Sequence, residues 1–357
     1  MYFKKVEISQ FRNLVSTSFI PSRSLNIIYG SNGSGKSSLL EALYYIATGN
    51  SFRSSKLSTV IQHDTDCLTL FSEVFSTVTH RVGIKRCRDL NNQTRVNSKD
   101  IQKRSELVQL LPLQIISPES ISLLLEGSDV RRSFIDWSLF HVEHSFYYHI
   151  SHYLRSLKQR NALLKSNDLS QIEYWNSQLS EYGEVIDSFR KQYVESILPV
   201  IAGLLHSLLP EVEIEVSYRS GWSKDIPLEE ALIRSQESDI KLKHTTVGPH
   251  RGDLIVKSGG VKVTDILSRG QLKLVVVAMK LAQILLLQSS TEKNPIILLD
   301  DIASELDIEH RALLLNTVKE LSSQVFVTTP DLDLIDYSNW DENKVFHVEH
   351  GQIKEVV

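Results

Sequence analysis

The stretch GSNGSGKS, from Gly30 to Ser37, matches the pattern G-x-x-x-x-G-K-[ST] in full. In such a loop, glycines let backbone N–H groups wrap a phosphate chain, the lysine reaches the β and γ oxygens, and the last hydroxyl holds Mg²⁺. An apolar run, LNIIY, precedes the pattern, and a helical run closed by Gly49 follows it. We therefore predict a nucleotide-binding phosphate loop; the alternative is a flexible glycine turn. The candidate nucleotide ligands in it are Gly30, Ser31, Asn32, Gly33, Ser34, Gly35, Lys36, Ser37 and Ser38.

A phosphate loop needs an acidic partner for its Mg²⁺ on a neighbouring strand. The run PIILLDD ends an apolar stretch in Asp300 and Asp301. We predict that Asp300 and Ser37 hold the metal, and that Asp301 orients or deprotonates the attacking water. Lys36, Asp300 and Asp301 are thus candidate catalytic residues. The alternative is that the two acids cap the helix that follows.

The chain changes character twice. Short apolar runs alternate with turn residues up to about residue 116, long helical patterns follow, and strand-like runs return after Glu211. Strands alternating with helices predict a sheet covered by helices. We predict an α/β fold in which residues 1–116 and 242–357 form one lobe with a mixed sheet. Residues 117–241 form an inserted helical lobe.

The inserted lobe carries two apolar stripes with helical spacing. Apolar residues from Ile172 to Tyr193 recur at alternating steps of three and four, and a second stripe runs from Phe146 to Leu164. This spacing predicts a helical seam, and Asp168 or Ser170 is the expected N-cap of the later helix. About thirty residues at 1.5 Å each give roughly 45 Å, so we expect a short antiparallel helical arm.

Composition is that of an ordinary globular protein: 357 residues, 41% hydrophobic and 23% charged, with a net charge of −4. The charge argues against a protein that coats nucleic acid, although it leaves room for local basic patches. Cys67 and Cys87 indicate neither a metal site nor a disulfide framework, which fits a reducing cytosol. The N-terminus lacks the apolar core of a signal peptide, and the run Leu274–Leu287, broken by Lys280 and Gln283, reads as a buried helix. We expect a cytoplasmic protein.

A second anion-binding feature is DILSRGQLKL, from Asp265 to Leu274, at the start of an expected helix. A helix start offers free N–H groups and a favourable dipole. The order of phosphate loop, LSRGQ, LLDD and ASELD resembles that of ABC-type ATPases, specifically the SMC-like heads of DNA-repair proteins. The stretches FRNL, SFRSSK, SPES, RRSFID and TTVGPHR extend the resemblance to the RecF family over the full chain. The resemblance implies an ABC-type P-loop ATPase head with a mixed sheet and an inserted helical lobe.

In ABC-type heads the signature stretch meets the nucleotide of a second copy. The resemblance therefore implies that Ser268, as a further catalytic residue, and Gly270 cap the γ-phosphate held by a partner protomer. ATP would then drive homodimer formation, and hydrolysis would weaken the dimer. A plain helix cap is the alternative for this stretch.

The resemblance also implies roles for residues outside these motifs. Arg12 and Asn13 would lie near the nucleotide phosphates and base. Gln114 would act as the Q-loop residue that couples the nucleotide to the helical lobe, or would simply be a buried glutamine with its hydrogen bonds satisfied. The residues that match the D-loop at the dimer interface are Ser304, Glu305 and Asp307.

Some positions depart from the ABC pattern. Asp301 stands where most ABC ATPases have a glutamate, and its shorter reach indicates slow hydrolysis. Thr328 and Thr329 stand where transporters have a switch histidine, and Gly252 stands where a second acid is expected in this family. Arg269, where transporters carry glycine, is expected for the RecF family.

Two basic segments are candidates for contacting DNA phosphates without reading sequence. Residues 81–104 contain eight Lys or Arg against two Asp, a balance of +6. The second segment, on the arm, consists of Arg155, Lys158, Arg160 and Lys165. The alternative is that both are solvated faces balanced by nearby acids.

The function implied by the resemblance is ATP-dependent DNA binding in recombinational gap repair, replication restart and SOS induction. A weak, DNA-dependent ATPase with ATP and Mg²⁺ as cofactors would close as a homodimer on single-strand/double-strand junctions. RecR and RecO would be its protein partners. The alternative is an SMC-like head that switches a protein complex without touching DNA. A transporter subunit would need the switch histidine, and an SMC tether would need far longer coiled coils.

Overall fold

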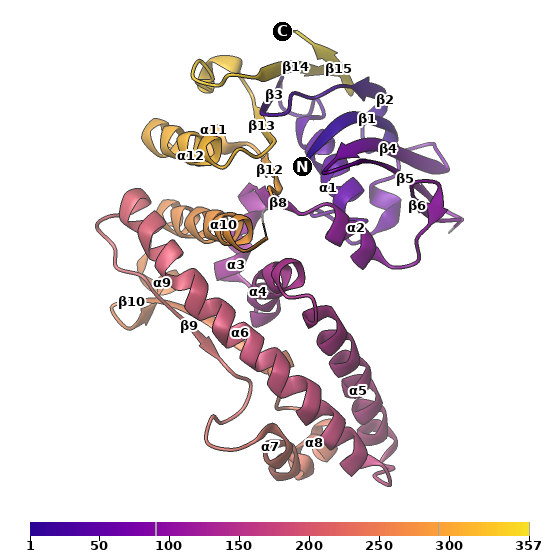
Figure 1. The fold of residues 1–357 in the computed structure, drawn as a ribbon, viewed down its shortest axis with the longest axis vertical. Helices are drawn as coiled ribbons and strands as arrows, with labels where there is room; N and C mark the ends of the chain where they lie inside the picture. The colour runs from indigo at the N-terminus through magenta and orange to yellow at the C-terminus, as the bar shows by residue number, and fades with distance from the viewer. Residues whose placement is uncertain (90, 292, 357) are drawn as a thin grey trace. The chain divides into compact units, whose positions relative to one another are not determined.

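The computed structural model describes residues 1–89, 91–291 and 293–356. The chain divides into two compact units (Figure 1). The first unit contains Met1–Ser120 and Glu292–Val357, and the second contains Ile121–Thr291. An insertion into a domain built from both ends of the chain is what the sequence predicts.

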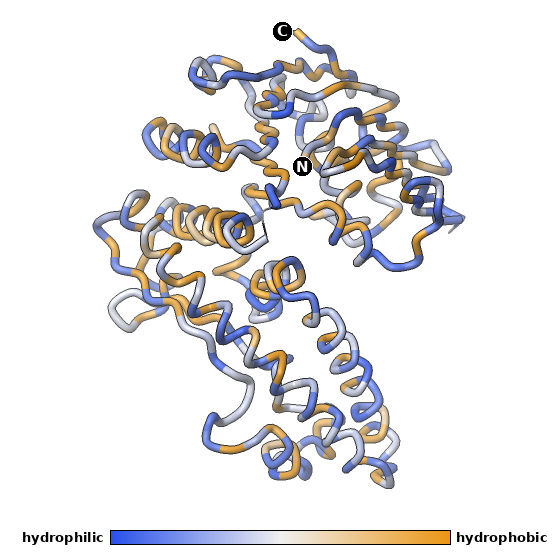
Figure 2. Tube along the Cα trace, viewed as in Figure 1, coloured by the Kyte–Doolittle hydropathy of each residue, from blue (hydrophilic) through white to orange (hydrophobic). Residues whose placement is uncertain are grey.

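One sheet of the first unit is largely parallel, and its strand order is β15-β14-β3-β13-β12-β8. Every residue of β12 and β13 is buried, as expected for parallel strands covered on both faces, and the trace in Figure 2 is orange through β12. Only β15 runs antiparallel to its neighbour. The strands are β3 (Leu25–Tyr29), β8 (Leu113–Ile116), β12 (Ile296–Leu299), β13 (Val325–Thr329), β14 (Asn343–Glu349) and β15 (Gln352–Glu355).

The other sheet of this unit is antiparallel, in the order β2-β1-β4-β5-β6-β7. Helix α1 (Lys36–Thr48) packs against strands of both sheets. It buries ten residues, including Leu39, Leu43 and Ile46, in a core shared by the two sheets. The strands are β1 (Tyr2–Phe11), β2 (Leu14–Phe19), β4 (Cys67–Phe75), β5 (Thr79–Cys87), β6 (Gln93–Val96) and β7 (Lys99–Asp100). Helices α2 (Arg104–Leu110), α11 (Ile302–Glu305) and α12 (Ile308–Glu320) complete the unit.

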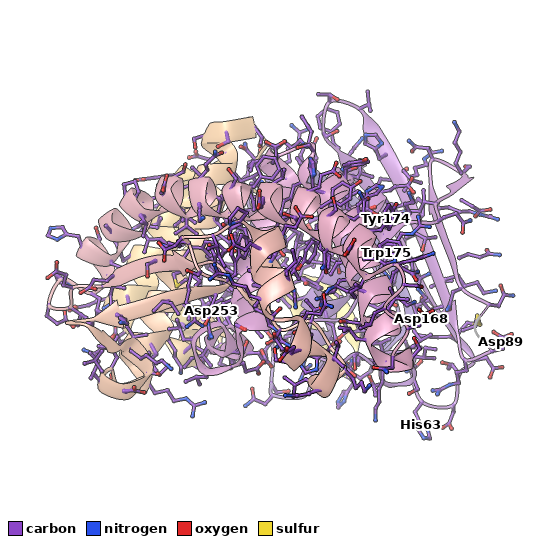
Figure 3. The ribbon with its side chains drawn as sticks, turned by 90° about the horizontal axis from the view of Figure 1, so that it is seen from below. His63, Asp89, Asp168, Tyr174, Trp175 and Asp253 are labelled. Atoms are coloured by element: carbon purple, nitrogen blue, oxygen red, sulfur yellow. A yellow bond between two sulfur atoms is a disulfide. The ribbon has the colours of Figure 1, made fainter. Side chains whose placement is uncertain are left out.

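Cys67 and Cys87 form a disulfide, so the expectation that they form none is wrong, and the cysteines no longer argue for a reducing cytosol. The residues are 20 positions apart in sequence, but β4 and β5 pair in a register that sets them directly opposite each other, with Cα atoms 4.1 Å apart. Asp89, two residues after Cys87, marks this end of the sheet in Figure 3. Spacing along the chain did not reveal the pair because the register of the hairpin determines it.

The second unit contains the predicted arm. Helices α5 (Phe146–Ser166) and α6 (Ile172–Leu208) pack side by side (Figure 1). Its other helices are α3 (Ser122–Leu125), α4 (Ser128–Val142), α7 (Leu228–Arg234), α8 (Gln236–Leu242), α9 (Val263–Ile266) and α10 (Arg269–Thr291). A small antiparallel sheet contains β9 (Glu215–Arg219), β10 (Asp253–Ser258) and β11 (Val261–Lys262).

The arm differs from expectation in two details. Helix α6 has 37 residues, about 55 Å at 1.5 Å per residue, so it is longer than predicted. Neither proposed N-cap residue caps it: the N-cap is Gln171, with no side-chain bond, and the Asp168 carboxylate accepts from the Ser170 N–H within the preceding loop. Figure 3 labels Asp168 together with Tyr174 and Trp175 near the start of α6.

The second domain boundary lies about fifty residues later than predicted. Residues 242–291 belong to the second unit because β10 pairs with β9 and α10 packs against α4 and α6. Helix α10 is the one helix of the described residues that is long and apolar enough to cross a membrane. However, 67% of its most apolar window is buried in the protein, which agrees with the expected buried helix.

Candidate functional site

The phosphate loop (Gly30–Ser37) connects β3 to α1, as the sequence predicts. Gly30 has φ +152°, and a Cβ atom there would lie 2.3 Å from the Val348 carbonyl oxygen of β14, so only glycine fits. The Lys36 ammonium donates to the Gly30 carbonyl at 2.6 Å and to the Ser31 carbonyl at 3.0 Å. Burial lowers the pKa of Lys36, and the nearby Asp301 and Asp300 carboxylates oppose that shift.

Two acids meet this loop at the end of β12. The Ser37 hydroxyl donates to Asp300 Oδ1 at 3.0 Å, and the Thr328 hydroxyl donates to the same oxygen at 2.7 Å. Burial raises the pKa of Asp300, while the hydrogen bonds from Thr328 and Ser37 act in the opposite direction. The structure therefore brings together the hydroxyl and the carboxylate that the sequence assigns to the metal.

Thr328 also holds Asp301, because the Asp301 N–H donates to the Thr328 hydroxyl at 2.8 Å. Asp301 has φ +51°, a left-handed conformation that non-glycine residues adopt at local cost. Its carboxylate accepts from the Ser304 hydroxyl at 2.8 Å. Sequence reasoning missed Thr328 because it was noted only as a replacement for histidine; its place at the end of β13, beside β12, gives it this role.

A pocket of about 810 Å³ opens beside the phosphate loop. Many of the predicted site residues line it: Arg12, Asn13, Asn32, Gly33, Gly35, Lys36, Ser37, Ser38 and Asp301. Further lining residues were not predicted to lie there: Arg53, Ser58, Thr59, Ile61, His63, Arg88 and Thr328. The motif SFRSSK carried a signal for Arg53, since it formed part of the family resemblance without an assigned role.

Arg12 lies in the pocket but is bound to a buried carboxylate. Its guanidinium donates to both oxygens of Glu41, at 3.0 and 2.6 Å, and to the Thr59 carbonyl at 2.7 Å. The Glu41 side chain is 0% exposed in α1, so Arg12 compensates a charge that the core could not otherwise hold. Asn13 donates to the Gly33 carbonyl of the phosphate loop at 3.2 Å.

Gln114 does not reach the pocket. It lies in β8 and pairs with Ile297 of β12, which is three residues before Asp300. Its side chain is buried and does not line the pocket described above. The structure therefore favours the buried-glutamine alternative over the Q-loop role, because the register of β8 sets this residue back from the strand ends.

The signature stretch lies in the second unit. Ser268, Arg269 and Gly270 are exposed at the start of α10. The Ser268 hydroxyl accepts from the Gln271 N–H at 3.3 Å, and Gln271 Oε1 accepts from the Ser268 N–H at 2.9 Å. This is a reciprocal capping box, so the helix-cap alternative is realised within the unit. Of the D-loop residues, Asp307 caps α12 by accepting from the His310 N–H.

The structure gives a reason for glycine at position 252. A Cβ atom there would lie 2.6 Å from the Tyr218 hydroxyl. The Gly252 carbonyl accepts from Arg132 at 2.8 Å. The next residue, Asp253, labelled in Figure 3, pairs with Arg131 at 2.7 Å. A side chain at position 252 would have to displace the buried Tyr218, and an acid is present one position later.

The arm's basic segment includes one residue that cannot contact DNA. Arg160 is fully buried and donates to Asp239 at 2.8 Å, Asn176 at 2.7 Å and Thr245 at 2.8 Å. It faces the interior because α5 turns that side towards α8, which a count of charges along the chain could not reveal. Arg160 is therefore removed from the candidate DNA contacts.

The family model named RecF/RecN/SMC N terminal domain matches residues 2–354. The chain is 42% identical over 354 residues to the DNA replication and repair protein RecF of Shewanella woodyi, covering 98% of this chain and 97% of that protein. It is 40% identical to the RecF protein of Shewanella denitrificans, covering 99% of each chain.

Solved structures agree with these relatives. The structure of the recombination mediator protein RecF–ATP in the RecFOR pathway has a TM-score of 0.88 and is 27% identical, covering 100% of this chain and 98% of that one. An Smc head bound to the C-terminal winged-helix domain of ScpA has a TM-score of 0.63 at 17% identity, covering 100% and 97%, and this likeness concerns the fold alone. The predicted fold, an ABC-type ATPase head with an inserted helical lobe, is confirmed.

Proposed function

The chain belongs to the RecF family, and from that premise we propose that it is an ATP-dependent DNA-binding switch of DNA replication and repair. The observation that carries the proposal is the meeting of Lys36, Ser37 and Asp300 beside a pocket of about 810 Å³. Such a pocket is of the size that holds a nucleotide-sized ligand. A solved relative described as RecF–ATP supports ATP as that ligand.

The donor set suits Mg²⁺. Ligands in adjacent positions of an octahedral Mg²⁺ at 2.0–2.1 Å stand about 3 Å apart, and Ser37 Oγ lies 3.0 Å from Asp300 Oδ1. Within the described residues no cluster of three or more His, Cys, Asp or Glu offers a cage for another metal. Ser37 and Asp300 would therefore hold Mg²⁺, which when bound neutralises charge on the β and γ phosphates.

The other side chains divide the remaining work. Lys36 would leave the Gly30 and Ser31 carbonyls to bind the terminal phosphates, whose charge favours its protonated form. Asp301 would orient the attacking water. Thr328 holds the backbone N–H of Asp301, and Ser304 donates to the Asp301 carboxylate. An aspartate, one methylene shorter than the usual glutamate, supports slow turnover, so we propose a weak, DNA-dependent ATPase that acts as a timed switch.

Ser268 and Gly270 would complete the site of a second copy. Both are exposed. Apart from the adjacent residues and the backbone of α10, the described atom nearest to a Cβ atom at Gly270 would be the Ser268 hydroxyl at 4.0 Å, so an approaching phosphate would meet little obstruction. The free N–H groups at the start of the 23-residue α10 favour an anion. ATP would thus join two protomers, and hydrolysis would release them.

The proposed substrate is DNA at single-strand/double-strand junctions, in gap repair, replication restart and SOS induction, within the cytoplasm. The RecFOR pathway of the solved relative supports RecR and RecO as partners. The alternative is a head that switches a protein complex without binding DNA. Anisotropy of a fluorescent gapped duplex with ATP, with ADP and without nucleotide separates the two. Binding only with ATP supports the proposal; equal or absent binding favours the alternative.

Two variants test the ATP-driven dimer. Lys36→Met should abolish ATP-dependent pairing in sedimentation velocity, because the β and γ phosphates lose their cation. Ser268→Arg should bind fluorescent ATP as the wild type does but fail to pair. Normal pairing of Ser268→Arg would refute the role of the signature stretch across the dimer.

A further inference from the structure

The charges of the basic segment 81–104 are distributed unevenly once its partners are known. Arg81 pairs with Glu73 of β4 at 3.2 Å, and Arg95 pairs with Asp100 at 2.8 Å. Arg88 lines the nucleotide pocket and donates to the Thr65 carbonyl at 2.8 Å. The +6 balance therefore overstates the charge that is available to a ligand.

Three other cations of the segment line a second pocket of about 230 Å³, which we name the Arg86 pocket. Its cations come from two elements: Arg86 belongs to β5, and Lys103 and Arg104 lie at the start of α2. No Asp or Glu is among the described residues that line it: Arg86, Asn92, Thr94, Ile101, Gln102, Lys103, Arg104 and Leu107.

Arg86 is 9% exposed, and no ion pair joins it to an acid within the described residues. Its Cζ lies 5.9 Å from the centre of the Tyr45 ring. Its guanidinium donates to the Lys85 and Gln93 carbonyls at 3.0 and 2.7 Å and to the Thr94 hydroxyl at 2.9 Å. All three acceptors are neutral, and a guanidinium has five N–H donors. Burying a cation without an anion costs free energy, so an anion that binds beside Arg86 would be stabilised. The three hydrogen bonds fix the guanidinium in one orientation. The group is thus positioned to bind an anion.

Lys103 and Arg104 are exposed and add two positive charges to the lining of the pocket. Arg104 is held at its far end by Asn50, whose side-chain oxygen accepts from it at 2.6 Å. Asn50 follows Gly49, which ends the helix that begins in the phosphate loop. Glu106 of α2 accepts from the Lys103 backbone N–H at 3.4 Å and does not line the pocket.

We propose that the Arg86 pocket binds a backbone phosphate of DNA. This inference rests on the proposed function and assigns the DNA contact to one site. The volume of about 230 Å³ lies below the roughly 300–1,000 Å³ of pockets for whole small molecules, so it suits a single phosphodiester group. One buried guanidinium and two exposed cations can bind phosphate through charge-assisted hydrogen bonds, and such contacts do not read bases.

The test compares two double variants that each remove two positive charges from the same segment. Lys103→Gln/Arg104→Gln alters the Arg86 pocket, and Arg81→Gln/Arg95→Gln alters the paired cations. Binding of a gapped duplex is measured by anisotropy in the presence of ATP over a range of salt concentrations. We expect the pocket variant to bind at least about tenfold more weakly with a salt slope smaller by one to two, because each lost phosphate contact reduces that slope by about one. The control variant should stay within about twofold of the wild type.

Equal losses in both variants, or wild-type affinity of the pocket variant, would overturn the assignment. Fluorescent ATP should bind both variants normally, which separates this site from the nucleotide pocket. If DNA binding is unchanged in the pocket variant while inorganic phosphate raises the Tm of the wild type only, the pocket takes free phosphate and the DNA assignment fails. A wild type that binds no duplex in any nucleotide state would refute the proposed function itself, and this inference with it.

Discussion

Replacing Arg12 with alanine should destabilise the first unit through Glu41. The Glu41 side chain is 0% exposed, and Arg12 supplies two of its hydrogen bonds, at 3.0 and 2.6 Å. Removing one partner of a buried ion pair costs about 3–5 kcal/mol, because the other charge is left uncompensated. The Arg12 side chain is 21% exposed, and the Ser51 hydroxyl still donates to Glu41, so we expect a loss near the lower end, about 3 kcal/mol.

The assay is urea unfolding followed by far-UV circular dichroism, where a loss of stability lowers the midpoint at a constant slope. Glu41→Gln removes the buried charge. The loss of unfolding free energy in the double variant Arg12→Ala/Glu41→Gln should therefore be smaller, by at least about 1 kcal/mol, than the sum of the losses in the two single variants. Arg53→Ala is the matched control: Arg53 lines the same pocket, and no ion pair joins it to an acid within the described residues. Additivity of the Arg12 and Glu41 variants within about 0.5 kcal/mol would show that the residues are independent and refute the reasoning.

Three further predictions concern other contacts. Thr328→Val should reduce single-turnover ATP hydrolysis by about 10- to 100-fold with little change in ATP affinity, because Asp300 loses a donor and the Asp301 N–H loses its acceptor. The control is Thr329→Val, which removes a hydrogen bond to the Asp331 carbonyl. An equal loss of hydrolysis in both variants would contradict this prediction. Cys67→Ser should lower the free energy of unfolding by about 3 kcal/mol without reductant, as expected for a loop closed over 20 residues, and should have no such effect in dithiothreitol. Identical urea unfolding curves of the wild type with and without dithiothreitol would show that the thiols are unpaired in solution. Burial lowers the pKa of His250 to about 4. As the pH falls from about 6.5 to 4, this histidine is protonated in the unfolded chain before it is protonated in the folded one, so stability is lost over that window. Urea midpoints across this range should fall less steeply in His250→Gln than in the wild type, and parallel pH profiles would refute the assignment.

Several features were predictable because their causes are local. The phosphate loop needs glycines, a lysine and a hydroxyl at consecutive positions, so Gly30–Ser37 could be placed between β3 and α1 from its own residues. The arm was predictable from helical spacing. Its buried face also contains Asn176, Gly183 and Arg190, whereas the predicted Trp175 and Phe189 are only partly buried. An apolar pattern does not show where a polar residue is buried with a distant partner.

The domain boundary could not be predicted from the same patterns. Residues 242–291 alternate strand and helix as the first unit does, so composition assigned them to it. Their strand β10 pairs with β9, and their helix α10 packs on α6. Which sheet a strand joins depends on its partners, and period-two alternation is the same in either sheet.

By itself the sequence determined the nucleotide loop, the acids at the end of β12, the α/β class and the inserted arm. Only the tertiary structure decided the Cys67–Cys87 disulfide, the Arg12–Glu41 pair, the position of Thr328 between two acids and the crowding of Gly252 by Tyr218. The physical reason is range. A loop that binds phosphate uses neighbouring backbone groups, and helical periodicity repeats over a few residues, so both are visible in the order of the chain. Strand register and the compensation of buried charge join residues far apart, and these contacts are defined only when the chain packs.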